Sequence, residues 1–194
     1  MCEGYHTLWV WFMKQTFYIF RHALATKSDT GYGDEIETAG ILPEGIPPIE
    51  KLAVFLQTIT SDYNVSSGFL RCRQTSEIVS EITGKHFAFD KRLSEFYDET
   101  PGSFIDKVKN FLEEMERKKY KNIIICTHAA VIAVMIKMLM HRKIIPKDLY
   151  TNYPKPGMLL IIEDKKIEEK DFTDWRVNAH IRVKEQKSYF LSQS

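Results

Sequence analysis

Two short strand-like segments, the apolar run 17–20 and residues 122–126, each lead directly into a junction that carries a histidine. The first segment ends at Arg21 and His22, and the second is followed closely by His128. A short apolar run bounded by polar residues is typical of a buried strand. In an open α/β sheet, ligands bind at the edge where the strands end. The sequence therefore predicts that these junctions meet at one edge of a sheet.

Helical patterns alternate with these strands. Apolar residues recur at helical spacing, or form nearly continuous runs, over residues 49–59, 75–82, 104–115 and 129–140. Ser103 is suited to cap the third of these helices, and Gly84 marks the end of the second. A further strand is predicted over residues 157–162, followed by a turn at 164–166. Such alternation predicts an α/β fold of three layers, α/β/α, with a mostly parallel central sheet flanked by helices.

Length and charge limit the classes of protein that this chain can be. With 194 residues, 44% of them hydrophobic, the chain can bury a full core, and residues 13–194 are predicted to form a single domain. The 27 basic and 26 acidic side chains nearly cancel, so no overall field favours a nucleic acid or a membrane as partner. The three cysteines show no pairing or metal-ligand spacing, which favours a reducing, cytoplasmic setting.

The amino terminus carries an apolar run over residues 8–13, which is too short to span a bilayer and follows no basic leader. We interpret residues 1–12 as an extension that precedes the domain. An extra strand and a contact between the two copies of a homodimer are the alternative interpretations.

Four short motifs occur in order between about residue 15 and residue 142. They are Arg21-His22-Ala23, the segment from Ser67 to Thr75 with its Arg71, Leu93-Ser94-Glu95, and Thr127-His128-Ala129-Ala130. Together they resemble the signatures of the histidine phosphatase superfamily, also called the phosphoglycerate mutase-like family. Those signatures are Arg-His-Gly, Ser-Pro-Leu-x-Arg-Ala-x-Gln-Thr, Leu-x-Glu and Ser/Thr-His-Gly-Gly. The resemblance implies a phosphoglycerate mutase-like fold and phosphoryl-transfer chemistry.

The resemblance also implies a role for each matched residue. His22 would be the nucleophile that forms a phosphohistidine, and Glu95 the acid that protonates the leaving alcohol and then activates water. Arg21, Arg71 and His128 would bind the phosphoryl oxygens, since guanidinium groups match phosphate and the start of a helix favours an anion. The scheme requires no metal and no cofactor.

Other residues near the motifs are open to more than one interpretation. The stretch after Glu95 offers Asp98 and Glu99 as alternative acids. Ser28 falls on the family's usual Asn position, in a stretch where the family commonly has residues that contact the phosphate or the substrate, and we count it as a candidate phosphate ligand. Ala23 stands where the family has glycine, which leaves the substrate open.

The spacing of the motifs bears on the reaction. Glu95 and His128 are joined by little more than one predicted helix, whereas mutases of the family carry a long insertion there that caps the site. A small cap excludes less water, which favours hydrolysis over transfer to a second alcohol. We therefore expect a phosphatase that acts on a small phosphorylated substrate or on a phosphohistidine protein. Mutase-type phosphoryl transfer and phosphate-ligand binding without turnover are the alternatives.

Overall fold

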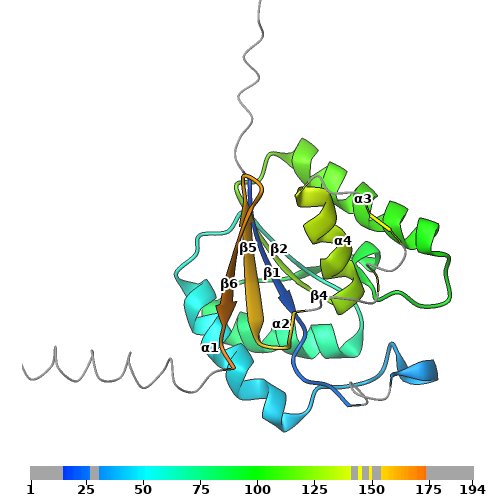
Figure 1. The fold of residues 1–194 in the computed structure, drawn as a ribbon. Coiled ribbons are helices and arrows are strands. Elements are labelled where there is room, and N and C mark those ends of the chain that lie inside the picture. The colour runs from blue at the N-terminus through cyan, green and yellow to red at the C-terminus, as the bar shows by residue number, and fades with distance from the viewer. Residues whose placement is uncertain (1–14, 27–30, 141–143, 146–148, 150–153, 174–194) are drawn as a thin grey trace, which may run out of the picture.

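The computed structural model describes residues 15–26, 31–140, 144–145, 149 and 154–173. Within this part of the chain, six strands form one sheet in the order β3-β2-β4-β1-β5-β6 (Figure 1). The strands are β1 (Thr16–Arg21), β2 (Tyr63–Ser66), β3 (Ala88–Phe89), β4 (Asn122–Thr127), β5 (Met158–Glu163) and β6 (Lys166–Asp171). The strands β3, β2, β4 and β1 are parallel, and β5 pairs antiparallel with both β1 and β6. The prediction of a mostly parallel sheet is confirmed.

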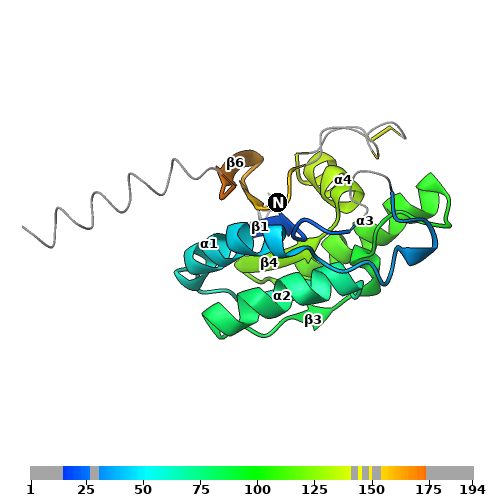
Figure 2. The ribbon, with the colours of Figure 1, turned by 90° about the horizontal axis from the view of Figure 1, so that it is seen from below.

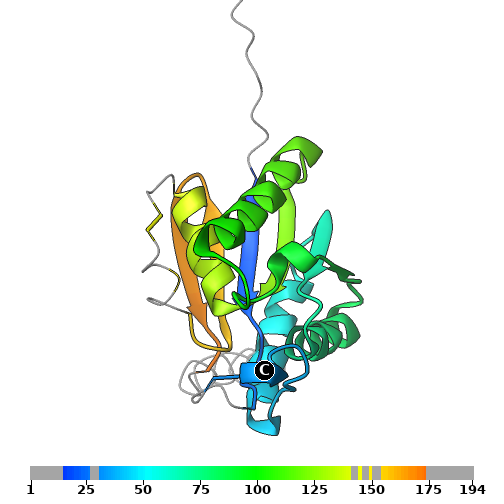
Figure 3. The same ribbon diagram turned by 90° about the vertical axis from the view of Figure 1, so that its right-hand side faces the viewer.

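Helices cover both faces of the sheet. They are α1 (Ile46–Gln57), α2 (Leu70–Thr83), α3 (Pro101–Lys118) and α4 (Ala129–Leu139). Figure 2 shows α1 and α2 on one face and α3 and α4 on the other, and Figure 3 shows α3 and α4 in front of the strands. Ile123 and Ile125 of β4 pack with α3 and α4, whereas Ile124 and Cys126 pack with α1 and α2, because successive side chains of a strand point to opposite faces. The three predicted layers are therefore present.

Helix α3 begins earlier than its sequence pattern indicated. Its N-cap is Thr100, whose Oγ1 accepts a hydrogen bond from the Ser103 backbone N–H at 3.2 Å. Pro101 follows in the first helical position, where no donor N–H is needed. The prediction of Ser103 as the cap was wrong, because Thr100 and Ser103 are both suitable cap residues and only the path of the backbone distinguishes them.

Helix α2 starts at Leu70, before the segment 75–82 that the apolar pattern indicated. Arg71 and Thr75 in its first turns are fully buried, so polar side chains occupy positions where the pattern of a buried helix face would have apolar ones. The helix ends as predicted at Gly84, whose φ of 70° is left-handed and therefore suits glycine.

The register of the parallel strands brings three junctions to one edge of the sheet. Arg21 of β1 pairs with Thr127 of β4, and Ser66 of β2 pairs with Cys126. The ladders continue for one residue, since backbone N–H groups after β1 and β2 donate to β4 carbonyls at 3.0 Å. The residues that follow the strands therefore lie side by side beyond this edge, and they are His22, Ser67 and His128.

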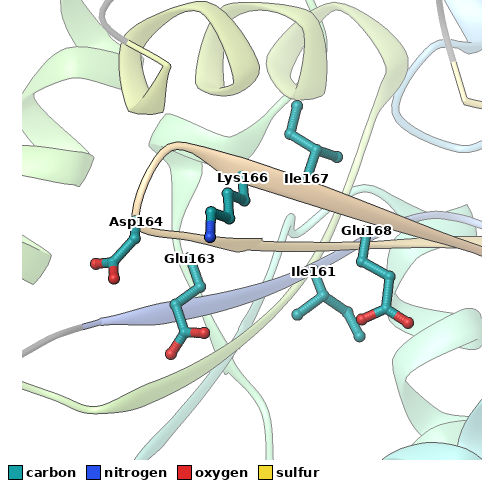
Figure 4. A pocket seen from close by; sticks show the side chains of 6 residues that line it. All are labelled: Ile161, Glu163, Asp164, Lys166, Ile167 and Glu168. Carbon is teal, nitrogen blue, oxygen red and sulfur yellow. The ribbon is translucent and has the colours of Figure 1, made fainter.

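A hollow lies on the β5–β6 hairpin (Figure 4). Its lining side chains are Ile161, Glu163, Asp164, Lys166, Ile167 and Glu168. Glu163 pairs with Thr16 at the start of β1, whereas the junctions follow the end of β1. The hollow therefore lies at the other end of the strands and is separate from the junctions.

Two sequence-based interpretations, those for residues 1–12 and for Ser28, concern positions outside the described residues. Within the described ranges, no helix has the length and apolar character needed to cross a membrane. In the same ranges, no three or more His, Cys, Asp or Glu side chains are grouped so that they could hold a metal ion.

Candidate active site

His22 follows β1 and is completely buried. Its Nδ1 lies 2.8 Å from the carbonyl oxygen of Ala23, and its Nε2 lies 3.2 Å from Nε of Arg71. A carbonyl only accepts hydrogen bonds and an arginine only donates them, so Nδ1 carries the proton and Nε2 the lone pair. Burial, and then the charges of Arg21 and Arg71, hold the pKa of His22 well below its usual range. The imidazole is therefore neutral, as a nitrogen nucleophile must be.

Arg21 and Arg71 supply donors without partners beside His22. Arg71 is fully buried and its Nη1 donates to the carbonyl of Ile36, while its Nη2 has no partner among the described residues. Arg21 donates from Nη1 to the Pro154 carbonyl at 3.5 Å, and its buried Nε has no partner in the described part of the chain. An unpaired buried guanidinium donor is unfavourable, and an anion that accepts from both groups removes this cost. The two arginines form the cationic part of an anion site.

His128 is the N-cap residue of α4 and is also completely buried. Its ring centroid lies 5.2 Å from that of His22, and its Nε2 lies 2.8 Å from Oγ of Ser67. That oxygen accepts a hydrogen bond from the backbone N–H of Phe69 at 3.3 Å, and its own hydrogen can donate to His128. Burial, followed by the charge of Arg71, lowers the pKa of His128 well below its usual range. A neutral ring that accepts at Nε2 keeps an N–H at Nδ1.

Glu95 is half-buried and lies in the loop that leads to α3. Its Oε1 accepts a hydrogen bond from the backbone N–H of Phe96 at 3.0 Å. Burial raises the pKa of Glu95, whereas backbone hydrogen bonds and the charges of Arg71 and Arg21 act in the opposite direction. The carboxyl group therefore lies within the field of the two arginines, where it can exchange a proton with a bound ligand.

The two alternative acids have other surroundings. Glu99 forms an ion pair with Lys107 of α3 and accepts a hydrogen bond from Oγ of Ser103 at 3.3 Å. Asp98 is exposed and adopts a left-handed φ of 49°. Glu99 thus serves the first turns of α3, and the geometry favours Glu95 over both alternatives.

Three residues to which the motifs assigned no role complete the arrangement. Oγ1 of Thr75 accepts a hydrogen bond from the Ala23 N–H at 2.9 Å and donates to the Arg71 carbonyl at 2.6 Å, which joins the loop after His22 to α2. Sγ of Cys72 lies 3.4 Å from Nε2 of the second histidine. The ring centroid of Tyr32 lies 4.1 Å from Cζ of Arg71. Thr75 and Cys72 lie inside the second motif, but Tyr32 lies outside all four motifs, so only folding reveals it.

Residues 17–99 match the family model of the histidine phosphatase superfamily (branch 1). The matched span contains His22, Arg71 and Glu95. This part of the chain is therefore similar to the histidine phosphatase superfamily. His128 follows the matched span, and the fold returns it to the side of His22. No curated protein matches the chain.

The chain shares its fold with solved structures. The alpha-ribazole phosphatase from Shigella flexneri has a TM-score of 0.68 at 16% identity, and the match covers 81% of this chain and 95% of that one. A phosphoglycerate mutase from Bacillus anthracis str. Sterne has a TM-score of 0.64 at 15% identity, with 82% and 94% covered. The protein histidine phosphatase SixA, complexed with tungstate, has a TM-score of 0.61 at 14% identity, with 82% and 98% covered. These likenesses establish the fold, and the family match supports an enzyme of the phosphatase type.

Proposed function

We propose that the protein is a phosphatase that hydrolyses a phosphomonoester or a phosphohistidine through a phosphohistidine intermediate on His22. One observation carries the proposal. A neutral histidine, with its lone pair at Nε2, lies within the field of two arginines that each hold a buried donor with no partner among the described residues. A phosphoryl group supplies both the acceptors that the arginines lack and the electrophile that the histidine attacks.

Binding of the phosphoryl group follows from the donors around His22. A phosphate oxygen accepts hydrogen bonds from Nε of Arg21 and from Nη2 of Arg71, and its charge offsets theirs. The first backbone N–H groups of α4, next to His128, add donors without helical partners, together with the positive end of the helix dipole. The site thus stabilises the charge of the phosphoryl oxygens in the transition state.

Transfer then proceeds in two balanced steps. In the first, the Nε2 lone pair of His22 forms the N–P bond, the P–O bond to the leaving alcohol breaks, and Glu95 gives its proton to the departing oxygen. In the second, the Glu95 carboxylate takes a proton from water, whose oxygen attacks phosphorus, and the N–P bond breaks. The Ala23 carbonyl accepts from Nδ1 throughout and stabilises the positive charge on the ring.

The short connection between Glu95 and His128 supports hydrolysis. In this fully described segment, the elements are a loop, α3 and β4, and the apolar face of α3 from Phe104 to Met115 packs in the core cluster on one face of the sheet. The segment therefore adds no separate cap over the site, and water can reach the phosphohistidine. Mutase-type transfer to a second alcohol is the alternative, because a phosphoglycerate mutase shares the fold.

Two substrate classes deserve a direct comparison. The proteins of similar fold include an alpha-ribazole phosphatase and a protein histidine phosphatase. We therefore propose to screen small phosphorylated metabolites and phosphohistidine proteins side by side, once turnover is established.

The test is hydrolysis of p-nitrophenyl phosphate between about pH 5 and pH 8 in the presence of EDTA. We expect turnover by the wild type, its loss in His22→Ala, and full turnover in the control His86→Ala, since His86 is an exposed histidine outside the site. Rapid quenching of the wild type should trap an acid-labile phosphoenzyme that His22→Ala does not form. An active His22→Ala enzyme would refute the proposed nucleophile.

A further inference from the structure

The guanidinium group of Arg71 is held on several sides before any substrate binds. Its Nε donates to Nε2 of His22 at 3.2 Å, and its Nη1 donates to the carbonyl of Ile36. The ring centroid of Tyr32 lies 4.1 Å from its Cζ, and that of Phe69 lies 5.4 Å away. Only Nη2 has no hydrogen-bond partner among the described residues.

The contact with His22 conflicts with the reaction proposed above. The lone pair on Nε2 must attack phosphorus, yet in this structure it accepts a hydrogen bond from Arg71. Attack therefore requires the Nε–H of Arg71 to leave His22. An incoming phosphoryl oxygen is a stronger acceptor than a neutral imidazole, because it is charged. Arg71 can transfer its hydrogen bond to that oxygen by a small rotation, provided that its guanidinium stays at the site.

Tyr32 is placed to keep the guanidinium at the site during this rotation. A contact between a cation and a ring depends on the separation of the two groups and not on the direction of one N–H bond. The contact therefore survives a rotation of the guanidinium that breaks the hydrogen bond to His22. The ring of Tyr32 also meets the His22 ring edge-on, with centroids 6.5 Å apart and an interplanar angle of 73°.

The backbone around Tyr32 is tied to the helix that carries Arg71. Tyr32 immediately precedes a short 3₁₀ helix, Gly33–Glu35, and the carbonyl that accepts from Nη1 belongs to the next residue, Ile36. The carbonyl of Glu37 accepts a hydrogen bond from the backbone N–H at the first residue of α2 at 2.9 Å. The segment that supplies the ring and the start of α2 are thus fixed relative to each other.

We propose that Tyr32 is a positioning residue of the phosphoryl-transfer site, and that its ring retains the Arg71 guanidinium while the Nε–H passes from His22 to a phosphoryl oxygen. This inference rests on the proposed function and assigns a role to a residue outside the four sequence motifs. Tyr32 acts through Arg71, so its loss affects the transition state more than the fold.

The test compares Tyr32→Phe, which keeps the ring, with Tyr32→Leu, which removes it. With p-nitrophenyl phosphate, we expect Tyr32→Phe to stay within about twofold of wild type and Tyr32→Leu to lose roughly ten- to thirtyfold in kcat/KM, mainly through kcat. Tungstate, a phosphate-like anion, should bind Tyr32→Leu more weakly and Tyr32→Phe normally. Tyr120→Leu is the matched control, because Tyr120 is similarly half-buried and stacks on Tyr63, away from the site.

Several results would overturn the inference. One is a Tyr32→Leu enzyme with unchanged kcat and unchanged tungstate affinity. Another is an equal loss in Tyr32→Phe, since the ring would then not be the active group. If Tyr32→Leu does not fold, the ¹⁵N resonances of the wild type test the proposed transfer of the hydrogen bond. Tungstate should shift the signals of Arg71 Nε and His22 Nε2, and no shift at saturation would refute the transfer of the hydrogen bond.

The inference and the proposed function fail in different ways. If His22→Ala hydrolyses p-nitrophenyl phosphate like the wild type, the proposed nucleophile is wrong, and tungstate binding by the two Tyr32 variants still tests the contact between Tyr32 and Arg71. If His22→Ala is inactive and Tyr32→Leu is fully active with normal tungstate affinity, the function holds and the positioning role is wrong.

Discussion

His22 and His128 are kept neutral for the same physical reason. Both rings are fully buried beside arginine charges, and burial is the larger cause that lowers each pKa. Ala23 contributes a carbonyl to His22 and a methyl group to the apolar cluster that includes Phe20 and Ile49. Its φ is not left-handed, so an alanine fits where the family signature has glycine without backbone strain.

The rate should depend on pH through His22 and Glu95. Because the pKa of His22 is lowered, protonation should remove activity only below about pH 6.5, the ordinary histidine value. Because the pKa of Glu95 is raised, its proton should remain available above about pH 4.3, the ordinary value, and activity should fall as the pH rises through that higher pKa. The measurement is kcat/KM against pH for the phosphate ester of an aliphatic alcohol, whose departure needs a proton.

Glu95→Gln separates the two limbs of this profile. The variant should lose at least about a hundredfold in kcat and lose the alkaline limb, while it keeps the acid limb set by His22. Glu99→Gln is the control, because Glu99 is paired with Lys107 on α3. An alkaline limb that persists in Glu95→Gln and disappears in Glu99→Gln would show that the acid is the other carboxylate.

Ser67 should matter through His128. Ser67→Ala removes the hydroxyl that lies 2.8 Å from Nε2 of His128, and the buried ring then loses this hydrogen bond. We therefore expect roughly a tenfold loss in kcat. Ser80→Ala is the matched control on α2, because the Ser80 hydroxyl donates to the Ser76 carbonyl at 2.7 Å and lies in the last turns of the helix. Steady-state kinetics of both variants test the difference, and equal kcat values would contradict the role of Ser67.

At the scale of elements, the first turns of α2 serve the fold and the site together. Arg71 extends from them to His22, and Thr75 binds the backbone at Ala23. Cys72 lies in the same turns and is buried in the apolar cluster against α1. Helix α2 therefore fixes the position of an arginine donor relative to His22. Helix α4 fixes the position of His128, which is its N-cap residue.

The start of α3 gives a prediction for helix capping. Thr100→Ala should lower the free energy of unfolding by about 0.5–2 kcal/mol, because it removes the oxygen that accepts from the Ser103 N–H. Ser103→Ala should cost less, because the Ser103 hydroxyl is exposed and makes a longer bond, 3.3 Å, to Glu99. Urea denaturation of both variants measures the difference. A larger loss in Ser103→Ala would contradict Thr100 as the cap.

At the scale of the whole molecule, the sheet separates two apolar clusters. Ile19 and Ile125 belong to the cluster beneath α3 and α4, and Phe20 and Ile124 belong to the one beneath α1 and α2. Both faces of β1 and β4 are therefore dry, and the strands read as continuous apolar runs. The polar residues His22 and His128 therefore lie beyond the ends of these strands, and the candidate site is at these ends.

Substitutions on neighbouring positions of β4 test this two-sided burial. Ile124→Ala and Ile125→Ala should each lower the free energy of unfolding by about 2–5 kcal/mol, because both side chains are fully buried on opposite faces. Val54 is an exposed residue of α1, with 57% of its surface accessible. Val54→Ala should therefore lower the free energy of unfolding much less than either isoleucine substitution. The three values come from chemical denaturation, and a mild effect at one isoleucine would mean that one face of the sheet is not a core.

Local patterns were sufficient to predict the layers of the fold, whereas the candidate site residues were predicted from the resemblance of four motifs to a known family. The short apolar runs predicted β1 and β4, and His22 and His128 are the histidines that directly follow these strands. These features depend on neighbours in the chain, so they are visible without the fold. The antiparallel pairing of β5 with β1 and with β6 was not visible in the sequence, because pairing direction is set by the path of the connection and not by the strand itself.

The tertiary structure alone decided how the site residues are held. The proton on Nδ1 of His22 follows from the Ala23 carbonyl and from Arg71, which α2 brings from a distant part of the sequence. The preference for Glu95 over Glu99 follows from the ion pair with Lys107, and the contact of Tyr32 follows from the course of its loop. Hydrogen bonds and burial depend on atoms that meet through strand register and helix packing. A linear sequence states which side chains exist, and only packing determines which of them share a dry environment.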